Sequence, residues 1–122
     1  MNSCKSINEV EPLAASIFKE VCTKFKSVLN TKMREAYLYG SYARGDYNKW
    51  SDIDILITVD ADYLEIEKYS DSIDDISSEI SLKYDITLSV TMKPAKQFER
   101  FADVLPYYSN VIKEGIRYSA VC

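Results

Sequence analysis

The sequence has 122 residues, a net charge of −4 and no histidine. This length predicts one domain, spanning residues 1–122, with little room for a second. The acidic balance disfavours direct binding to nucleic acid, because phosphate backbones select proteins with a basic face. The absence of histidine removes the commonest proton shuttle and the usual nitrogen ligand of zinc. Any bound metal is therefore expected to be a hard cation held by carboxylates.

The cysteines and the polarity of the chain predict its compartment. The three cysteines are scattered and odd in number, which does not suit a disulfide framework and favours a reducing environment. The first residues are too polar for a signal peptide, and no apolar run approaches the length of a membrane span. We therefore expect a cytoplasmic protein with no membrane partner.

A helix is predicted over about residues 11–30. Apolar residues recur there at steps of three and four, which is typical of a helix with one stripe against a sheet. These residues are Ala14, Ile17, Phe18, Val21, Phe25, Val28 and Leu29. Pro12 fits the first helical turn, where its missing N–H is not needed. The short alternating segment at 34–39 then predicts a strand that runs directly into Gly40 and Ser41.

The second predicted strand, Asp52 to Asp60, alternates in a way that orients its acids. Isoleucines and a valine occupy one face, at positions 53, 55, 57 and 59. Successive side chains on a strand point to opposite faces. Asp52 and Asp54 therefore project together from the other face, roughly 7 Å apart along the strand.

The other elements follow from the same periodicities. They are one helical turn at 42–44, a helix at 61–82, a strand at 84–91, a short helix at 94–103, a last helix from Pro106 to about Gly115, and an edge strand at 116–118. In the strand at 84–91, Asp85 faces away from the apolar side, as Asp52 and Asp54 do. This order predicts an α+β fold, with a small mixed β-sheet and helices packed mainly on one face. The core would span about 34–91, and the C-terminal helices about 94–118.

One stretch carries the candidate chemistry. Two of the three glycines lie within residues 40–54, where a Gly-Ser pair stands at one end and an Asp-x-Asp pair at the other. Glycine permits close approach of the backbone to a ligand, and a turn that starts a helix offers N–H groups and a hydroxyl to phosphate oxygens. Magnesium takes carboxylates together with substrate phosphates. The stretch therefore predicts a phosphate and metal site.

A second pair, Asp60 and Asp62, has the same spacing. It lies where a strand hands over to a helix, so we interpret it as turn and capping chemistry. Asp52 and Asp54 differ from it by the Gly-Ser turn upstream, by their shared face and by a third acid, Asp85. Two divalent ions about 3.5–4 Å apart can hold both the attacking and the leaving oxygen of a phosphoryl displacement. Asp52 and Asp54 would bridge such ions, and Asp85 would complete the second site and accept the proton of an incoming hydroxyl.

The aromatic residues near this stretch have simpler interpretations. Trp50, the only tryptophan, is interpreted as closing a small core rather than as stacking on a base. The ten tyrosines are interpreted mostly as half-buried positions of sheet and helix, rather than as sites of base stacking or self-modification.

The spacing of the glycine, serine and acids resembles a known motif. Gly40-Ser41, ten intervening residues and Asp52-Ile53-Asp54 resemble the G-S-x10-D-x-D signature of the DNA polymerase beta-type nucleotidyltransferase superfamily. The longer run YGSYARGDYNKWSDIDILI resembles the minimal nucleotidyltransferases of prokaryotes, which are usually paired with a HEPN protein. The resemblance spans about residues 34–118 and includes Tyr84-Asp85 and a closing helix that contains LPYY, an asparagine and KEG.

The resemblance implies a polymerase beta-like nucleotidyltransferase fold that uses ATP and two magnesium ions. Short members of this family act as antitoxins, which transfer AMP to a tyrosine of a cognate HEPN toxin and silence it. On this resemblance, the nucleotide-binding residues would be Gly40, Ser41 and Arg44, and the metal-binding and catalytic residues would be Asp52, Asp54 and Asp85.

Two other functions stay open on sequence grounds. The chain could neutralise a partner by contact alone, as a non-catalytic binding module with a vestigial metal site. It could also be an aminoglycoside-type nucleotidyltransferase that modifies a small molecule, although those enzymes commonly need additional sequence to build the acceptor pocket. The shortness of the chain also disfavours a template-dependent polymerase, which must grip a nucleic acid.

Overall fold

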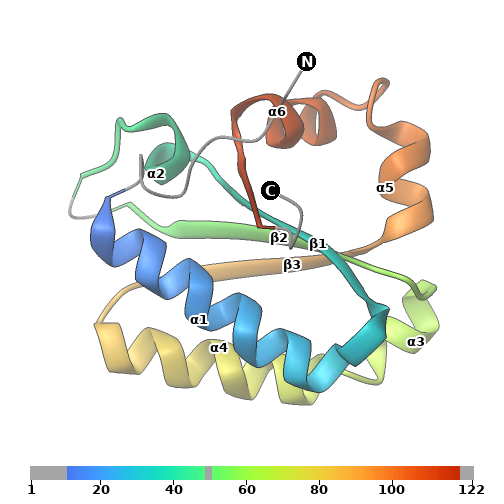
Figure 1. Ribbon diagram of the computed structural model, residues 1–122, viewed down its shortest axis with the longest axis horizontal. Coiled ribbons are helices and arrows are strands. Elements are labelled where there is room, and N and C mark those ends of the chain that lie inside the picture. The colour runs from blue at the N-terminus through green and yellow to red at the C-terminus, as the bar shows by residue number, and fades with distance from the viewer. Residues whose placement is uncertain (1–10, 49–50, 119–122) are drawn as a thin grey trace.

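The computed structural model describes residues 11–48 and 51–118. Its sheet has four strands in the order β3-β2-β1-β4. They are β1 (Met33–Tyr39), β2 (Ile53–Val59), β3 (Leu88–Pro94) and β4 (Ile116–Tyr118). β1 pairs antiparallel with β2 and β4, whereas β2 and β3 run parallel. The mixed sheet is confirmed (Figure 1). β4 forms one of its edges, as predicted.

Helices lie on both sides of this sheet (Figure 1). α1 (Pro12–Leu29) and α4 (Ser70–Tyr84) cover one face, and α5 (Ala95–Phe101) and α6 (Pro106–Glu114) cover the other. The shorter elements are the 3-10 turn η2 (Asn30–Lys32), α2 (Ser41–Arg44) and α3 (Tyr63–Glu67). The helix predicted over 61–82 is thus two helices, α3 and α4, which a turn at 68–69 separates. Within the described ranges, every helix is too short or too polar to cross a membrane.

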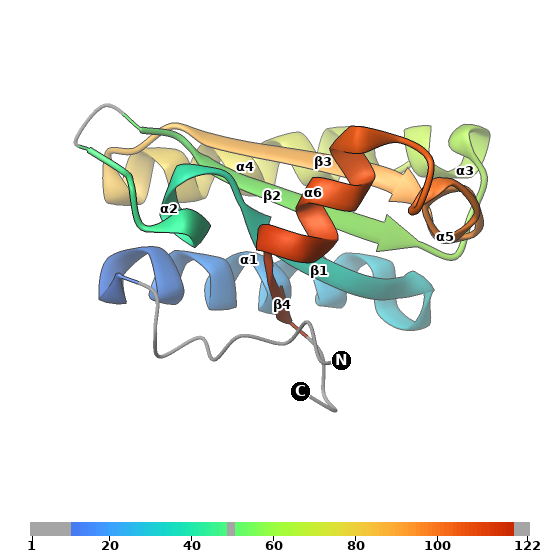
Figure 2. The same ribbon diagram turned by 90° about the horizontal axis from the view of Figure 1, so that it is seen from above.

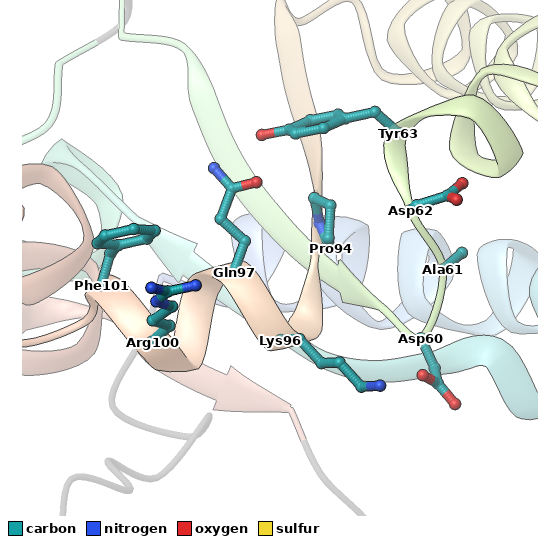
Figure 3. Close-up of a pocket in the computed structure, with 9 residues that line it drawn as sticks. All are labelled: Asp60, Ala61, Asp62, Tyr63, Pro94, Lys96, Gln97, Arg100 and Phe101. Carbon is teal, nitrogen blue, oxygen red and sulfur yellow. The ribbon is translucent and has the colours of Figure 1, made fainter.

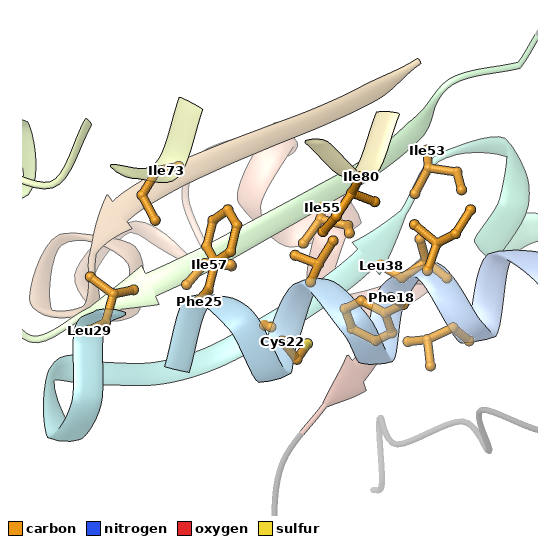
Figure 4. Packing of buried hydrophobic residues seen from close by; sticks show 14 of the residues in the cluster. Phe18, Cys22, Phe25, Leu29, Leu38, Ile53, Ile55, Ile57, Ile73 and Ile80 are labelled. Atoms are coloured by element: carbon orange, nitrogen blue, oxygen red, sulfur yellow. The ribbon is translucent and has the colours of Figure 1, made fainter. Parts of the chain in front are cut away.

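The larger core lies between the sheet and the pair α1 and α4. The apolar stripe of α1 is buried along the length of the helix, because its members recur every three or four residues and face the sheet. They pack against the predicted core face of β2, as Figure 4 shows for Phe18, Phe25, Ile55 and Ile57. Burial of each such side chain stabilises the fold by about 1.5–3 kcal/mol. The predicted first helix is therefore confirmed.

A second, smaller cluster lies on the opposite face, under α5 and α6. Tyr37 of β1 and Leu56 of β2 pack there against Phe98, Tyr108 and Val111. Both strands thus place alternate residues in the two clusters, which confirms the predicted strand phase and the α+β class. The two C-terminal helices are also confirmed. Seen from above, α6 crosses over β1 and β2 (Figure 2).

The third strand begins later than predicted. It starts at Leu88 rather than at Tyr84. Asp85 instead ends α4 in the left-handed conformation, with φ 52° and ψ 51°. Tyr84 and Ile86 still pack against the larger core. Their alternation with Leu88 therefore resembles a strand, although it arises from the end of a helix and the turn that follows it.

Candidate active site

The predicted site lies where β1 ends and β2 begins, and the antiparallel pairing brings Tyr39 opposite Asp54. Gly40 follows with φ 80° and ψ −156°, a combination that is essentially restricted to glycine. A Cβ atom at Gly40 would lie 2.5 Å from the Asp54 carboxylate oxygen Oδ2, closer than two such atoms can approach. Glycine therefore allows the backbone of the Gly-Ser turn to lie against this carboxylate.

The Gly-Ser pair opens a single helical turn, α2, as predicted. The N–H groups of Ala43 and Arg44 both donate to the Gly40 carbonyl oxygen at 3.1 Å. Gly45 ends the turn in the left-handed conformation, and its N–H donates to the Ser41 carbonyl at 2.9 Å. The turn thus holds Ser41 and Arg44 beside the corner between β1 and β2.

The loop that joins α2 to β2 is held by its own contacts. The rings of Tyr42 and Tyr47 stack with centroids 4.5 Å apart and planes 10° from parallel. The Asn48 N–H donates to Ser51 Oγ at 2.9 Å, and the Ser51 N–H donates to the Asn48 carbonyl at 3.0 Å. These contacts hold the described parts of the loop ahead of β2's first residues. Trp50, for which the sequence predicts a core role, lies outside the described residues.

A cavity of about 390 Å³ opens between α2, the two central strands and α6. Gly40, Ser41 and Arg44, the predicted nucleotide-binding residues, line it together with Asp54 of the predicted metal pair. The other lining residues are Tyr39, Tyr107, Asn110, Val111 and Glu114. The structure thus brings four of the six predicted site residues to one cavity.

The two acids of the motif differ in exposure. Asp54 is half-buried, whereas Asp52 is exposed just before β2. Burial raises the pKa of the Asp54 carboxyl, the charge of Asp52 raises this pKa further, and Arg44 opposes the rise. Burial and a like charge both disfavour the ionised carboxylate. A divalent cation beside the two acids would offset that penalty, and magnesium prefers oxygen donors of this kind. The residues present therefore fit a hard divalent cation.

Arg44 connects α2 with α6 at this cavity. Its Nε donates to Asp46 Oδ2 at 3.2 Å, and its Nη1 lies 3.6 Å from Glu114 Oε1. Both acids raise the pKa of the guanidinium, Asp46 more strongly than Glu114. These ion pairs are solvent-exposed and therefore weak. Arg44 can thus exchange them for a phosphate, because a guanidinium binds phosphate through two parallel hydrogen bonds.

The contribution of α6 to the cavity was missed by the sequence-based assignment of site residues. Tyr107, Asn110 and Glu114 are spaced by three and four residues, so they share one face of the helix. That spacing is visible in the sequence, but nothing there indicates which helix lies over the motif. The Tyr107 hydroxyl is 2.8 Å from the Tyr39 hydroxyl. The pKa of Tyr39 lies far above its usual range. Burial is the largest cause of this rise, and the hydrogen bond with Tyr107 is the second.

Asp85, the predicted third acid, is positioned differently from the prediction. It ends α4, which covers the larger core, and it is exposed. The β3 residue paired with Asp54 is instead Ser89. Within residues 11–48 and 51–118, no three acids, cysteines or histidines form a group that could hold a metal. The strand geometry that suggested a role for Asp85 is therefore wrong, and its role as a metal ligand and base stays a prediction.

The second Asp-x-Asp pair has the turn and capping role predicted for it. Asp62 Oδ1 accepts a hydrogen bond of 2.9 Å from the Glu65 N–H and so caps α3. Asp60 and Asp62 border a larger cavity, of about 490 Å³, beyond the other end of β2 (Figure 3). Its remaining lining residues are Ala61, Tyr63, Pro94, Lys96, Gln97, Arg100 and Phe101. The predicted motif thus lies at the smaller of these two cavities.

Some known proteins are similar to this chain in sequence, and a solved structure is similar to it in fold. "Putative protein adenylyltransferase MJ0604" of Methanocaldococcus jannaschii is 33% identical over 97 residues, which cover 80% of this chain and 89% of that protein. "Putative protein adenylyltransferase MJ0141" of the same organism is 42% identical over 73 residues, or 60% of this chain and 72% of that protein.

A crystal structure of a mutant of the toxin-antitoxin MntA-HpeT has the same fold, with a TM-score of 0.50 at 15% identity over 79% of this chain and 68% of that chain. The family model described as "Nucleotidyltransferase domain" matches residues 15–119. The resemblance that the motif carries is therefore confirmed, and the chain belongs to the nucleotidyltransferase domain family.

Proposed function

We propose that the protein is a cytoplasmic, magnesium-dependent nucleotidyltransferase that transfers AMP from ATP to a tyrosine hydroxyl of a cognate HEPN toxin. The observation that carries this proposal is the close approach of Gly40 to Asp54, which sets the Gly-Ser backbone against a carboxylate of the Asp-x-Asp pair within one cavity. The names of the adenylyltransferase relatives support a protein acceptor. The fold shared with MntA-HpeT agrees with a toxin partner.

ATP would bind with its triphosphate along the Gly-Ser turn. At Gly40 no side chain separates the backbone from the ligand, so phosphate oxygens can approach closely. The Ser41 hydroxyl can donate to one of these oxygens, and Arg44 can offer charge-assisted hydrogen bonds. All three residues line the same cavity. Together they would bind the triphosphate and orient it toward the acids.

Asp52 and Asp54 would hold magnesium, which when bound neutralises the negative charge on the phosphates. The charge of the exposed Asp52 raises the pKa of the half-buried Asp54, and a cation beside both carboxylates would relieve this repulsion. The arrangement with two ions and Asp85 as the third ligand stays a prediction.

The transfer would be an in-line displacement. The tyrosine oxygen of the partner attacks the α-phosphorus of ATP, and the new oxygen–phosphorus bond forms as the bond to the β-phosphate oxygen breaks. Pyrophosphate then leaves, and the phenolic proton passes to water at the exposed site. Arg44 lines the cavity and is exposed, so it is positioned to stabilise the charge that develops on the phosphates. Because Arg44 and Asp52 are both exposed, a protein surface can reach the site.

Incubation of the purified chain with ATP, magnesium and a HEPN toxin, chosen as the product of an adjacent gene, tests this proposal. Mass spectrometry of the partner is expected to show one or more AMP groups on a tyrosine, together with loss of toxicity. The modification should disappear when EDTA is added and in the Asp52→Asn variant. A partner that is inhibited but unmodified would support the binding module instead. Transfer of AMP to an aminoglycoside, with an unmodified partner, would support the small-molecule enzyme.

A further inference from the structure

Tyr107 is an exposed tyrosine whose ring lines the candidate active site. It shares the cavity with Gly40, Ser41 and Asp54 and is 42% exposed. We propose that Tyr107 is a self-modification site, to which the protein transfers AMP from ATP bound in the same cavity. This inference rests on the proposed nucleotidyltransferase function and adds an acceptor within the chain itself.

The position of the Tyr107 hydroxyl is held by contacts on two sides. On one side it forms a hydrogen bond of 2.8 Å with the Tyr39 hydroxyl, and the two rings meet edge to face with centroids 5.8 Å apart. On the other side, the centroid of the Tyr107 ring lies 5.6 Å from that of Tyr108, which is buried in the second cluster. These contacts keep the hydroxyl at the cavity wall, because Tyr39 is itself a lining residue opposite Asp54.

Other tyrosines near the two cavities and in the second cluster are less suited to accept AMP from this cavity. Tyr39, which also lines it, is only partly accessible, whereas the tyrosines of the second cluster are buried. Tyr63 is 49% exposed but lines the cavity beyond the other end of β2. Tyr42 and Tyr47 stack on each other in the loop beside α2. Tyr107 therefore combines exposure with a place in the cavity.

The reaction is balanced without a further reactant. The Tyr107 oxygen attacks the α-phosphorus of ATP, the new oxygen–phosphorus bond forms, and the bond from that phosphorus to the bridging oxygen of the β-phosphate breaks. Pyrophosphate leaves, and the phenolic proton passes to water at the exposed side of the ring. Because the acceptor and the nucleotide share one cavity, the reaction gains the advantage of proximity that intramolecular reactions have.

Self-modification would also regulate the site. The attached AMP would remain beside Ser41 and Asp54, in a cavity of about 390 Å³, and would hinder binding of another ATP. A chain without its partner would therefore stop after one turnover, whereas a partner that covers the site could take up the AMP first.

The test is incubation of the full chain alone with ATP and magnesium, followed by intact and peptide mass spectrometry. We expect one AMP group per chain, mapped to Tyr107, and a first-order rate that does not change when the protein is diluted. Tyr107→Phe retains the ring and should lower the label to background. Tyr63→Phe, which removes a comparably exposed hydroxyl from the other cavity, should leave it unchanged. Thermal unfolding of both variants checks that each is folded.

Two results would overturn the inference and leave the proposed function intact. One is an unlabelled chain that still modifies its partner, and the other is a label on a residue other than Tyr107. A labelling rate that rises with protein concentration would overturn the intramolecular transfer. A chain that labels neither itself nor its partner would contradict this inference and the proposed function together. Label on Tyr107 without modification of a partner would support the inference and count against the proposed acceptor.

Discussion

The two Asp-x-Asp pairs lie at opposite ends of the same strand, β2, and have different surroundings. Asp52 and Asp54 lie at its start, where Asp54 lines a cavity and the backbone of Gly40 approaches its carboxylate. Asp60 and Asp62 follow its last residue, where Asp62 caps a helix. Identical spacing in the sequence therefore leads to two different roles.

The difference teaches that neither acid spacing nor cavity size identifies this site. The cavity beside the capping pair is the larger one, about 490 Å³ against about 390 Å³. What distinguishes the pairs is the set of groups near each carboxylate. Asp62 uses an oxygen to satisfy a backbone N–H of its own turn. Asp54 is half-buried beside a second acid, an arrangement that favours a cation.

Substitution of one acid in each pair should give the largest contrast. Asp54→Asn is expected to lower AMP transfer roughly a thousandfold, because a metal-bound transition state is worth several kcal/mol. Asp62→Asn should keep full activity, because asparagine also caps helices well. Radiolabelled AMP transfer to the partner measures both variants, with circular dichroism as a check of folding. Equal losses in the two variants would contradict the assignment of roles.

The glycines of the turn allow a matched test of the contact with Asp54. Gly40→Ala and Gly45→Ala both put a side chain at positive φ, at 80° and 89°, and each should lower the free energy of unfolding by about 1–2 kcal/mol. An added Cβ would collide with Asp54 only at Gly40, since at Gly45 no described atom lies within 4 Å. Transfer should therefore fall about a hundredfold in Gly40→Ala and persist in Gly45→Ala. Urea unfolding measures the backbone strain in both variants, and the transfer assay measures the effect of the collision with Asp54. Similar transfer activity in both variants would argue against the contact between Gly40 and Asp54.

Asp85→Asn tests the third acid without changing its backbone. Asparagine tolerates the left-handed conformation that Asp85 adopts, so a loss of transfer would report the missing carboxylate. Because Asp85 is exposed and ends a helix over the larger core, we expect a smaller loss than for Asp54→Asn. Transfer rates measured over a range of magnesium concentrations provide the comparison. A loss as large as that of Asp54→Asn would establish Asp85 as a ligand or base.

The pH dependence of stability should show the smallest difference. The pKa of Asp54 in the folded protein is raised above the ordinary value of 3.8, so the folded state holds this proton more tightly than the unfolded state. The stability that results is present below pH 3.8 and is lost as pH rises through the folded pKa. Urea unfolding in EDTA should show this fall in the wild type and a weaker one in Asp54→Asn. The same fall in both proteins would contradict the raised pKa.

Much of the fold and part of the site follow from local patterns. The alternation of β2 places Ile53 in the larger core and Asp54 on the other face, because successive side chains on a strand point to opposite sides. The steps of three and four in α1 bury its stripe for a similar reason. Gly40 and Gly45 are predictable as the limits of a short turn, because their positive φ suits glycine.

The sequence by itself thus determined which residues share a strand face, where the Gly-Ser turn lies, and to which family the chain belongs. The tertiary structure alone decided that α6 brings Tyr107 and Glu114 to the cavity and that Asp85 ends a helix. The physical reason is the distance along the chain over which each signal acts. Periodicity reports which side of an element is buried, whereas the partner that covers it depends on packing between segments far apart in the chain. For that reason Tyr84 and Ile86 could follow a strand pattern and still belong to the end of α4 and its turn.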